Sequence, residues 1–145
     1  MTSESLATAH AHWRAPYFAS LLQQGAVVAC PAEGVWGLSC DPHNEAAVYD
    51  VLAIKDRPVS KGLIVVADRP EVFGPLLDAL PIGQRNVIMA SWPGPNTWLV
   101  PHCGLLPEWI TGDSEEVAIR VTSSPALSAV CRAFGGPLVS TSANP

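Results

Sequence analysis

Positive charge is scarce in this 145-residue chain, in which eight Lys and Arg stand against 13 Asp and Glu, for a formal net charge of −5. Broad, non-specific binding to nucleic acid needs an extended basic face, so the composition argues against it. The chain also has no apolar run of the ~20 residues that a membrane-spanning helix needs. Its polar, Ala-rich beginning, residues 1–12, has no apolar signal core. We therefore expect a cytoplasmic protein.

Cysteine is rare as well, and its four positions form no Cys-x-x-Cys pair. No histidine stands near them at the spacing of a metal site. We therefore expect no metal role, and interpret the cysteines as small buried hydrophobic residues in a reducing compartment. The four residues are Cys30, Cys40, Cys103 and Cys131.

Familiar nucleotide-binding and hydrolase motifs are missing too. The chain has neither a Walker A loop nor a Gly-x-Gly-x-x-Gly sequence. Its four histidines lie in the N-terminal tail or in expected loops, so a Ser-His-Asp pattern finds no support. No residue pattern indicates a covalent nucleophile.

Apolar residues, by contrast, are plentiful: 48% of the chain is hydrophobic and only 14% is charged, enough to bury a full core. Helical and strand-like segments mix throughout, which predicts one α/β domain with a mixed sheet over residues 13–145, after a polar tail at 1–12. Asn44 and Ser124 are expected to cap two helices. Helices are expected over residues 13–24, 45–55, 70–77, 82–91 and 125–134, and strands over 26–30, 38–40, 63–67, 97–100, 117–121 and 137–141.

Three of the eight cationic residues, Lys55, Arg57 and Lys61, fall within seven positions. They lie where a helix is expected to end and a buried strand, residues 63–67, to begin. A guanidinium with two point charges suits phosphate or carboxylate, which favours an anion pocket. The alternative is that Lys55 and Arg57 only complement the dipole of the preceding helix.

Two further segments could carry chemistry. Arg120 follows apolar residues in an expected strand, where an unpaired guanidinium is costly, so it needs a bound anion or a buried acid. Glu33, Glu115 and Glu116 are the candidate acids. The polar C-terminal segment 140–144 could cradle phosphate oxygens through backbone N–H groups or simply form a capping turn.

The order of these patterns is more specific than any one of them. The chain contains Pro-x-Glu-x-x-Trp-Gly-Leu, Lys-x-Arg-Pro, Lys-Gly-Leu, Ser-Trp-Pro-Gly-Pro-x-Thr, Ala-Ile-Arg-Val and Ser-Thr-Ser-Ala-Asn, in this order. Over residues 23–144 this series resembles the YrdC-like family of threonylcarbamoyl-AMP synthases, in its short bacterial form. The resemblance implies a twisted open mixed sheet with flanking helices and a basic site on its concave face.

The resemblance also implies an activity. Family members condense L-threonine, bicarbonate or CO2 and ATP into threonylcarbamoyladenylate and release pyrophosphate, with Mg²⁺ accompanying ATP. A transferase complex then passes the threonylcarbamoyl group to an adenosine of certain tRNAs. Weak RNA binding is a further expectation. The alternatives are an RNA-binding module or an inactive paralogue of the same fold.

Residue by residue, the family's Lys-x-Arg signature falls on Lys55 and Arg57, which are expected to be catalytic. Its Ser-x-Asn signature falls on Ser142 and Asn144. Arg57, Ser142 and Asn144 would bind ATP, with Lys61 near the phosphates.

The threonine side of the site is implied in the same way. Arg120 matches an arginine that holds the threonine carboxylate, and Ser140 lies where threonine is expected to bind. Ala32 replaces a family threonine, and the lost hydroxyl is expected to weaken threonine binding or alter its geometry. Trp36 replaces a smaller aromatic residue but keeps a flat apolar wall, so this change is expected to matter less. The family also continues beyond the Ser-x-Asn signature, so we expect a shortened domain here.

Overall fold

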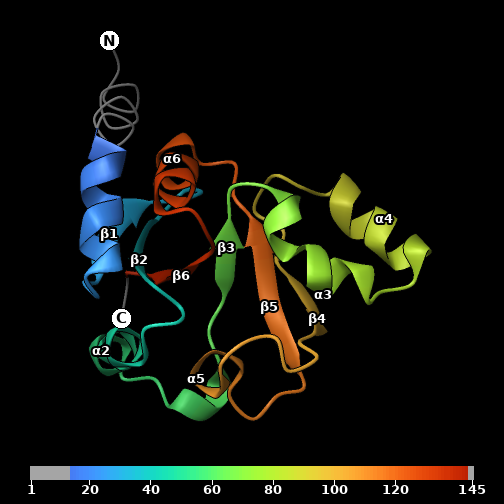
Figure 1. Ribbon diagram of the computed structural model, residues 1–145, viewed down its shortest axis with the longest axis horizontal. Helices are drawn as coiled ribbons and strands as arrows, with labels where there is room; N and C mark the ends of the chain where they lie inside the picture. The colour runs from blue at the N-terminus through green and yellow to red at the C-terminus, as the bar shows by residue number, and fades with distance from the viewer. Residues whose placement is uncertain (1–13, 144–145) are drawn as a thin grey trace.

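A six-stranded mixed sheet forms the centre of the computed structural model, which describes residues 14–143 (Figure 1). The strand order is β1-β2-β6-β3-β5-β4, and β3 runs parallel to β5 while the other neighbours are antiparallel. The expected α/β class with an open mixed sheet is confirmed. The strands are β1 (Val28–Pro31), β2 (Trp36–Cys40), β3 (Val65–Ala67), β4 (Trp98–Pro101), β5 (Glu116–Val121) and β6 (Leu138–Ser142).

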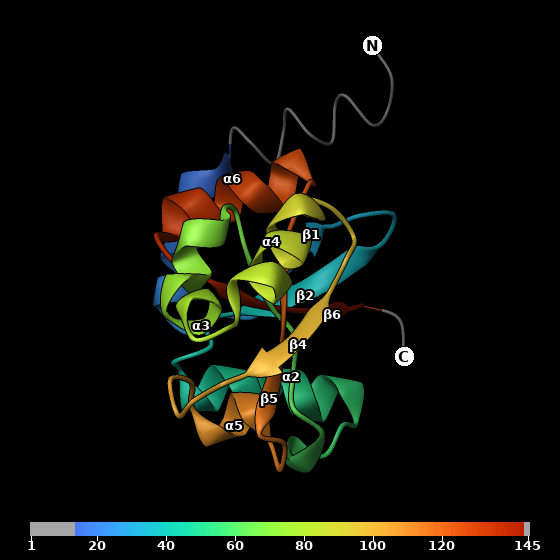
Figure 2. The same ribbon diagram turned by 90° about the vertical axis from the view of Figure 1, so that its right-hand side faces the viewer.

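Helices pack on both faces of this sheet. Residues 14–23 are helical, and the further helices are α2 (Glu45–Lys55), α3 (Gly74–Asp78), α4 (Ile82–Ala90), α5 (Glu108–Thr111) and α6 (Pro125–Phe134), with 3-10 turns η1 (Val59–Lys61) and η2 (Pro70–Phe73). In both ribbon views α6 lies at the top and α2 and α5 lie at the bottom (Figures 1 and 2). Both expected caps are present: Asn44 Oδ1 accepts from Ala47 N at 3.0 Å, and Ser124 Oγ accepts from Leu127 N at 3.3 Å.

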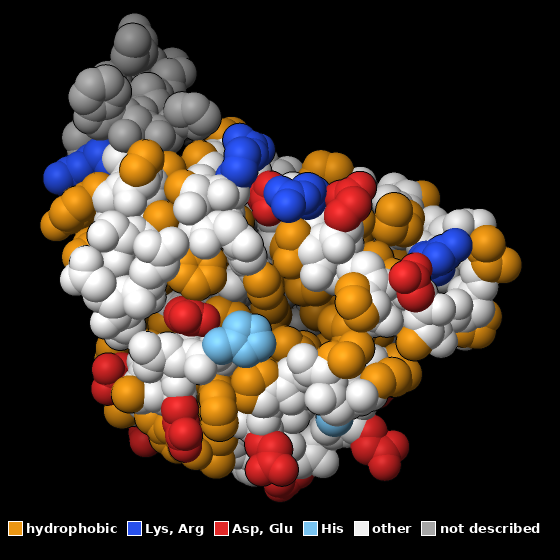
Figure 3. Space-filling view, viewed as in Figure 1, with side chains coloured by type: hydrophobic (Ala, Val, Ile, Leu, Met, Phe, Trp, Pro, Cys, Tyr) orange, Lys and Arg blue, Asp and Glu red, His pale blue; other side chains and the backbone are white. Residues whose placement is uncertain are grey.

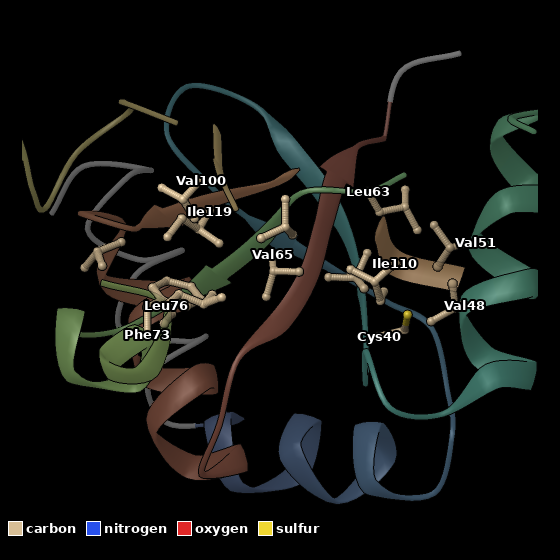
Figure 4. Close-up of a cluster of buried hydrophobic side chains, with 14 of the residues drawn as sticks. Cys40, Val48, Val51, Leu63, Val65, Phe73, Leu76, Val100, Ile110 and Ile119 are labelled. Carbon is tan, nitrogen blue, oxygen red and sulfur yellow. The ribbon is translucent and has the colours of Figure 1, made fainter. Parts of the chain in front are cut away.

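The strands separate two hydrophobic cores because successive side chains point to opposite faces. Along β5, Val117, Ile119 and Val121 enter the larger core, which also holds side chains of α2, α3, α4 and α5. Figure 4 shows part of that cluster, in which Val48 and Val51 of α2 approach Ile110 of α5. The smaller core lies on the opposite face, beneath α6 and the helix at 14–23.

The face that carries the smaller core is covered only in part. Val66 and Leu138 are fully buried there, against α6. Farther along the same face Ile64 is 37% exposed, and Leu99 of the outer strand β4 is 65% exposed. An open area therefore remains on this face beside the smaller core.

Several sequence expectations need correction. The first strand begins at Val28, two residues later than expected, and a short helix, α5, lies in a segment that was expected to be a loop. The helix expected over 70–77 is divided into η2 and α3, because Pro75 has no N–H with which to continue α-helical hydrogen bonding. Cys103 is exposed rather than buried, because it lies in the turn after β4, where φ is +53°.

Two expectations concern the ends of the chain and membranes. The expected tail at 1–12, Trp13 and Asn144 lie outside the described residues. Among the residues that are described, none of the helices is both long and apolar enough to span a bilayer.

Candidate active site

Arg120 lies on the partly open face and has an acidic partner. It stands opposite Val66 of the smaller core in the parallel register of β3 and β5, so both side chains point the same way. Its Nη1 is 3.5 Å from Oε2 of Glu33, with only 16% of the Arg120 side chain and 14% of the Glu33 side chain exposed. Of the three candidate acids, the structure therefore selects Glu33, whereas Glu115 and Glu116 are exposed.

Glu33 itself is held at the junction between β5 and α6. Its Oε1 accepts hydrogen bonds from the Thr122 hydroxyl and from the backbone N–H groups of Ser123, at 2.6 Å, and Ser124, at 3.3 Å. Burial raises the pKa of this carboxyl, but the hydrogen bonds from Thr122 and Ser123 and the charge of Arg120 outweigh it, so the pKa is below its ordinary value. Glu33 therefore remains an anion at neutral pH.

Three buried polar atoms, two of them in this ion pair, lack hydrogen-bond partners within residues 14–143. Arg120 Nε, Glu33 Oε2 and Ser39 Oγ have no hydrogen-bond partner among the described residues. Native proteins satisfy most buried polar groups, so each exception requires an explanation. A guanidinium with an unused donor on a partly open face is suited to binding a carboxylate.

Two serines of β6 lie on the same face as Arg120. Ser140 pairs in register with Ser39, and Ser142 pairs with Gly37. Across β1, Ser39 and Gly37 pair with Val28 and Cys30, which both belong to the smaller core. Ser140 is 6% exposed, whereas Ser142, one strand repeat farther on, is exposed. The structure thus brings both predicted serines to the face that carries Arg120.

The cationic segment lies at the end of β3 that is nearer to α5. Lys55 occupies the last turn of α2, while Arg57 follows the end of that helix and Arg57 Nε donates to Gly62 O at 3.0 Å. Arg57 and Lys61 are exposed. They line a small cavity of about 80 Å³ whose other walls include Ile64 and Ala118.

This cavity links the two halves of the predicted site. Ala118 is two residues before Arg120 on β5, so their side chains share one face. Likewise, the backbone N–H of Ser140 donates to Ile64 O at 3.1 Å. Arg57 and Lys61 therefore lie beside the part of β5 that precedes Arg120, whereas Lys55 does not line this cavity. The Arg57 backbone N–H donates to Leu52 O of α2, but its side chain donates to Gly62 O of the loop, so the helix dipole alone does not explain the position of the guanidinium.

Ala32 lies in the loop between β1 and β2, next to Glu33. Its N–H donates to Val35 O at 2.8 Å, and its methyl group packs against the smaller core. Position 32 thus presents a methyl group and no hydroxyl beside Glu33. Trp36, at the start of β2, is 57% exposed.

The comparison with protein families matches residues 20–145 to the Sua5/YciO/YrdC model, which carries the description "Telomere recombination". The chain belongs to this family. The resemblance inferred from the motifs is therefore confirmed, and membership covers all the predicted site residues.

Named proteins and solved structures resemble this chain. The chain is 55% identical over 133 residues to the threonylcarbamoyl-AMP synthase of Stutzerimonas stutzeri, covering 92% of this chain and 71% of that protein. It is 52% identical over 132 residues to the enzyme of the same name from Cellvibrio japonicus, covering 91% of this chain and 70% of that one. The crystal structure of P. abyssi Sua5 complexed with L-threonine superposes with a TM-score of 0.83 at 28% identity, covering 92% of this chain and 39% of that chain.

Sequence reasoning missed part of this site. Thr122 and Ser123 were not singled out, and Ser124 was interpreted only as a helix cap, although all three donate to Glu33. The run Thr-Ser-Ser directly after an apolar strand was the available signal. Two of the three donors are backbone N–H groups, which no residue type reveals.

Proposed function

We propose that this chain is a threonylcarbamoyl-AMP synthase, which condenses L-threonine, bicarbonate or CO2 and ATP and releases pyrophosphate. The observation that carries the proposal is the buried Arg120–Glu33 pair on the same sheet face as Ser140, with Arg57 and Lys61 beside the strand that carries Arg120. The names of the relatives at 52–55% identity support it. The chain spans about 70% of the length of these relatives.

The proposed chemistry has two bond-forming steps. The threonine amine attacks the carbon of bicarbonate or CO2 to give a carbamate, with loss of water when bicarbonate is used and of a proton to solvent when CO2 is used. A carbamate oxygen then attacks the α-phosphorus of ATP, and pyrophosphate leaves with the electron pair of the broken P–O bond. No covalent bond to the protein is required, so catalysis rests on positioning and charge neutralisation.

Each proposed role follows from charge. A carboxylate, a carbamate and a triphosphate repel one another strongly in a site of low effective dielectric. We assign Lys55, Arg57 and Lys61 to the phosphates, with Lys55 and Arg57 neutralising charge during adenylyl transfer. Ser142 and Asn144 are assigned to the nucleotide.

The threonine pocket is assigned to the other half of the site. Arg120 would bind the threonine carboxylate bidentately, and Ser140 would hydrogen-bond the amino acid. Ala32, which has no hydroxyl, would form an apolar wall.

Mg²⁺ is proposed to enter with ATP. Within residues 14–143 no group of three or more His, Cys, Asp or Glu could hold a metal ion, so no protein ligand is assigned. The phosphate oxygens are the hard ligands that Mg²⁺ prefers, and when bound it would neutralise phosphate charge. The product is proposed to go to a transferase complex that modifies tRNA.

The experiment is pyrophosphate release by the chain with ATP, Mg²⁺ and bicarbonate, with and without L-threonine. We expect release that requires threonine. Arg57→Ala should reduce it at least about a hundredfold, as the loss of a charge-stabilising donor typically does. Arg85→Ala is the matched control, because Arg85 pairs with Asp78 near α4 and not with the site. Release without threonine, or equal rates in both variants, would refute the proposal.

A further inference from the structure

We propose that Glu33 is a positioning residue: it fixes the Arg120 guanidinium in the orientation that receives the threonine carboxylate. This inference rests on the function proposed above. It assigns to the carboxylate of the β1–β2 loop a role in the reaction beyond structural pairing.

Glu33 is suited to this role because it is held on several sides. Three donors from the β5–α6 junction converge on its Oε1. The loop that carries it is closed by Ala32 N donating to Val35 O, and Ser124 Oγ donates to Pro31 O at 2.8 Å. The carboxylate is therefore held firmly at the start of α6, through its own side chain and through the backbone of Pro31 just before it.

Arg120, in contrast, has few constraints of its own. Its guanidinium lies at the end of a long side chain. Within residues 14–143, the polar contact that the structure gives this group is the ion pair between Nη1 and Glu33 Oε2. Its Nε has no partner there. Pairing through Nη1 leaves the edge formed by Nε and Nη2, whose two parallel N–H groups match the two oxygens of a carboxylate. Fixing one edge of the guanidinium thus orients the other.

If Glu33 acted through its charge alone, neutralising it would change threonine binding in the opposite direction from the change that a positioning role predicts. Glu33 is an anion beside the place where the substrate carboxylate would bind, so neutralising it removes a repulsion and should strengthen threonine binding. If Glu33 acts by orienting Arg120, neutralising it should weaken threonine binding. The sign of the change therefore separates the two explanations.

The test compares Glu33→Gln with the wild-type chain in threonine-dependent pyrophosphate release. Misplacing a binding group by about 1 Å can cost up to about a hundredfold, so we expect the KM for L-threonine to rise about ten- to a hundredfold. The KM for ATP and kcat should stay within about threefold, because the amide oxygen of the new side chain still accepts from Thr122 and Ser123. Glu115→Gln, an exposed carboxylate just before the strand that carries Arg120, is the matched control and should change neither KM.

A second pair of variants tests the same geometry from the other side. Thr122→Val removes the hydroxyl that donates to Glu33 and should also raise the threonine KM. Thr122→Ser keeps the donor, so its threonine KM should stay near the wild-type value. Calorimetric titration with L-threonine and with L-threoninamide, which lacks the carboxylate, completes the test. The wild type should prefer L-threonine, and Glu33→Gln should lose most of that preference.

The outcomes are distinguishable. If the wild type turns over L-threonine and Glu33→Gln has an unchanged or lower KM for threonine, the positioning role is overturned and the proposed function is not. An equal loss toward threonine and ATP, with a lower melting temperature, would make Glu33 merely structural and overturn it as well. A folded wild type that neither binds nor turns over L-threonine would overturn the proposed function, and the positioning role with it.

Discussion

At the scale of single residues, the ionised state of Glu33 ties the site to the stability of the fold. Burial raises its pKa, but hydrogen bonds from Thr122 and Ser123 and the charge of Arg120 outweigh this effect and bring the pKa below the ordinary 4.5. Because the folded pKa is below the unfolded one, the stabilisation is fully present above pH 4.5 and is lost as the pH falls through the folded pKa.

We therefore predict that Glu33→Gln flattens the acid limb of the stability curve. Measured by thermal unfolding between neutral pH and pH 3, the wild type should lose more stability than the variant below about pH 4.5, because only the wild type must protonate a paired carboxylate. Glu115→Gln should follow the wild-type curve. Parallel curves for wild type and Glu33→Gln across the acid range would show that Glu33 does not titrate with folding.

The cysteines give a second prediction at this scale. Cys30, Cys40 and Cys131 are buried, and burial is the largest cause that raises their pKa values, to about 11 for Cys30 and about 12 for the other two. The thiolate is the reactive form, so these three should be inert in the native state. Cys103 is exposed.

A thiol reagent such as DTNB at pH 8 should therefore label one cysteine per folded chain quickly and all four only after denaturation. Cys103→Ser should abolish the fast phase. Rapid labelling of two or more sites in the native chain would contradict the buried positions of the other three.

At the scale of elements, the loop that carries the site cations depends on a close crossing of two backbones. Leu63 N donates to Ile110 O at 2.9 Å, and Asp113 N donates to Ser60 O at 3.0 Å, so η1 lies against the end of α5. At Gly112 φ is +64°, and an added Cβ would lie 2.7 Å from Gly62 N. Only glycine fits both the backbone angle and the space.

We predict that Gly112→Ala lowers the free energy of unfolding by about 3 kcal/mol, since it combines a left-handed backbone with a clash. Urea unfolding measures this change. The control is Gly83→Ala in α4, where an added Cβ meets nothing within 4 Å. That variant should stabilise the protein by about 0.5–1 kcal/mol, because alanine is the better helix former. Similar effects of the two substitutions would argue against the crossing.

Elements also show what the sequence could and could not predict. The caps Asn44 and Ser124 were predictable because a cap is a local interaction, decided within three residues of chain. The four-residue helix α5 was not, since it is too short to display a helical period.

Part of the candidate site could likewise be predicted from the sequence, and part could not. The chemistry of Arg120 predicts that it needs a buried acid or a bound anion, but Glu33 lies 87 positions earlier, and only the folded structure shows that these two meet. The motif order predicted the family, whereas the donors from Ser123 and Ser124 to Glu33 depend on backbone geometry.

At the scale of the whole molecule, charge is unevenly placed. In the view of Figure 3, acidic side chains dot the lower half, while the visible Lys and Arg side chains lie along the upper and right-hand edges. With a net charge of −5, attraction to RNA can come only from local clusters such as Arg57 and Lys61. Such binding should be weak and strongly salt-dependent.

We predict that fluorescence anisotropy with labelled tRNA shows weak binding in low salt that largely disappears at physiological salt. Lys61→Ala should reduce the slope of log affinity against log salt by about 1 if Lys61 contacts a phosphate. Tight binding that does not respond to salt would instead favour an RNA-binding module.

The position of β6 in the sheet has a consequence for how the chain is made. This strand is synthesised after the other five, yet it hydrogen-bonds to β2 on one side and to β3 on the other, so it joins the β1–β2 hairpin to the β3–β5–β4 half. While β6 is still inside the ribosome, these two parts expose facing strand edges that nothing yet pairs, and such edges are prone to aggregation. The serines of β6 join the face that carries Arg120 only when this gap closes, so the candidate site is assembled when the sheet becomes continuous.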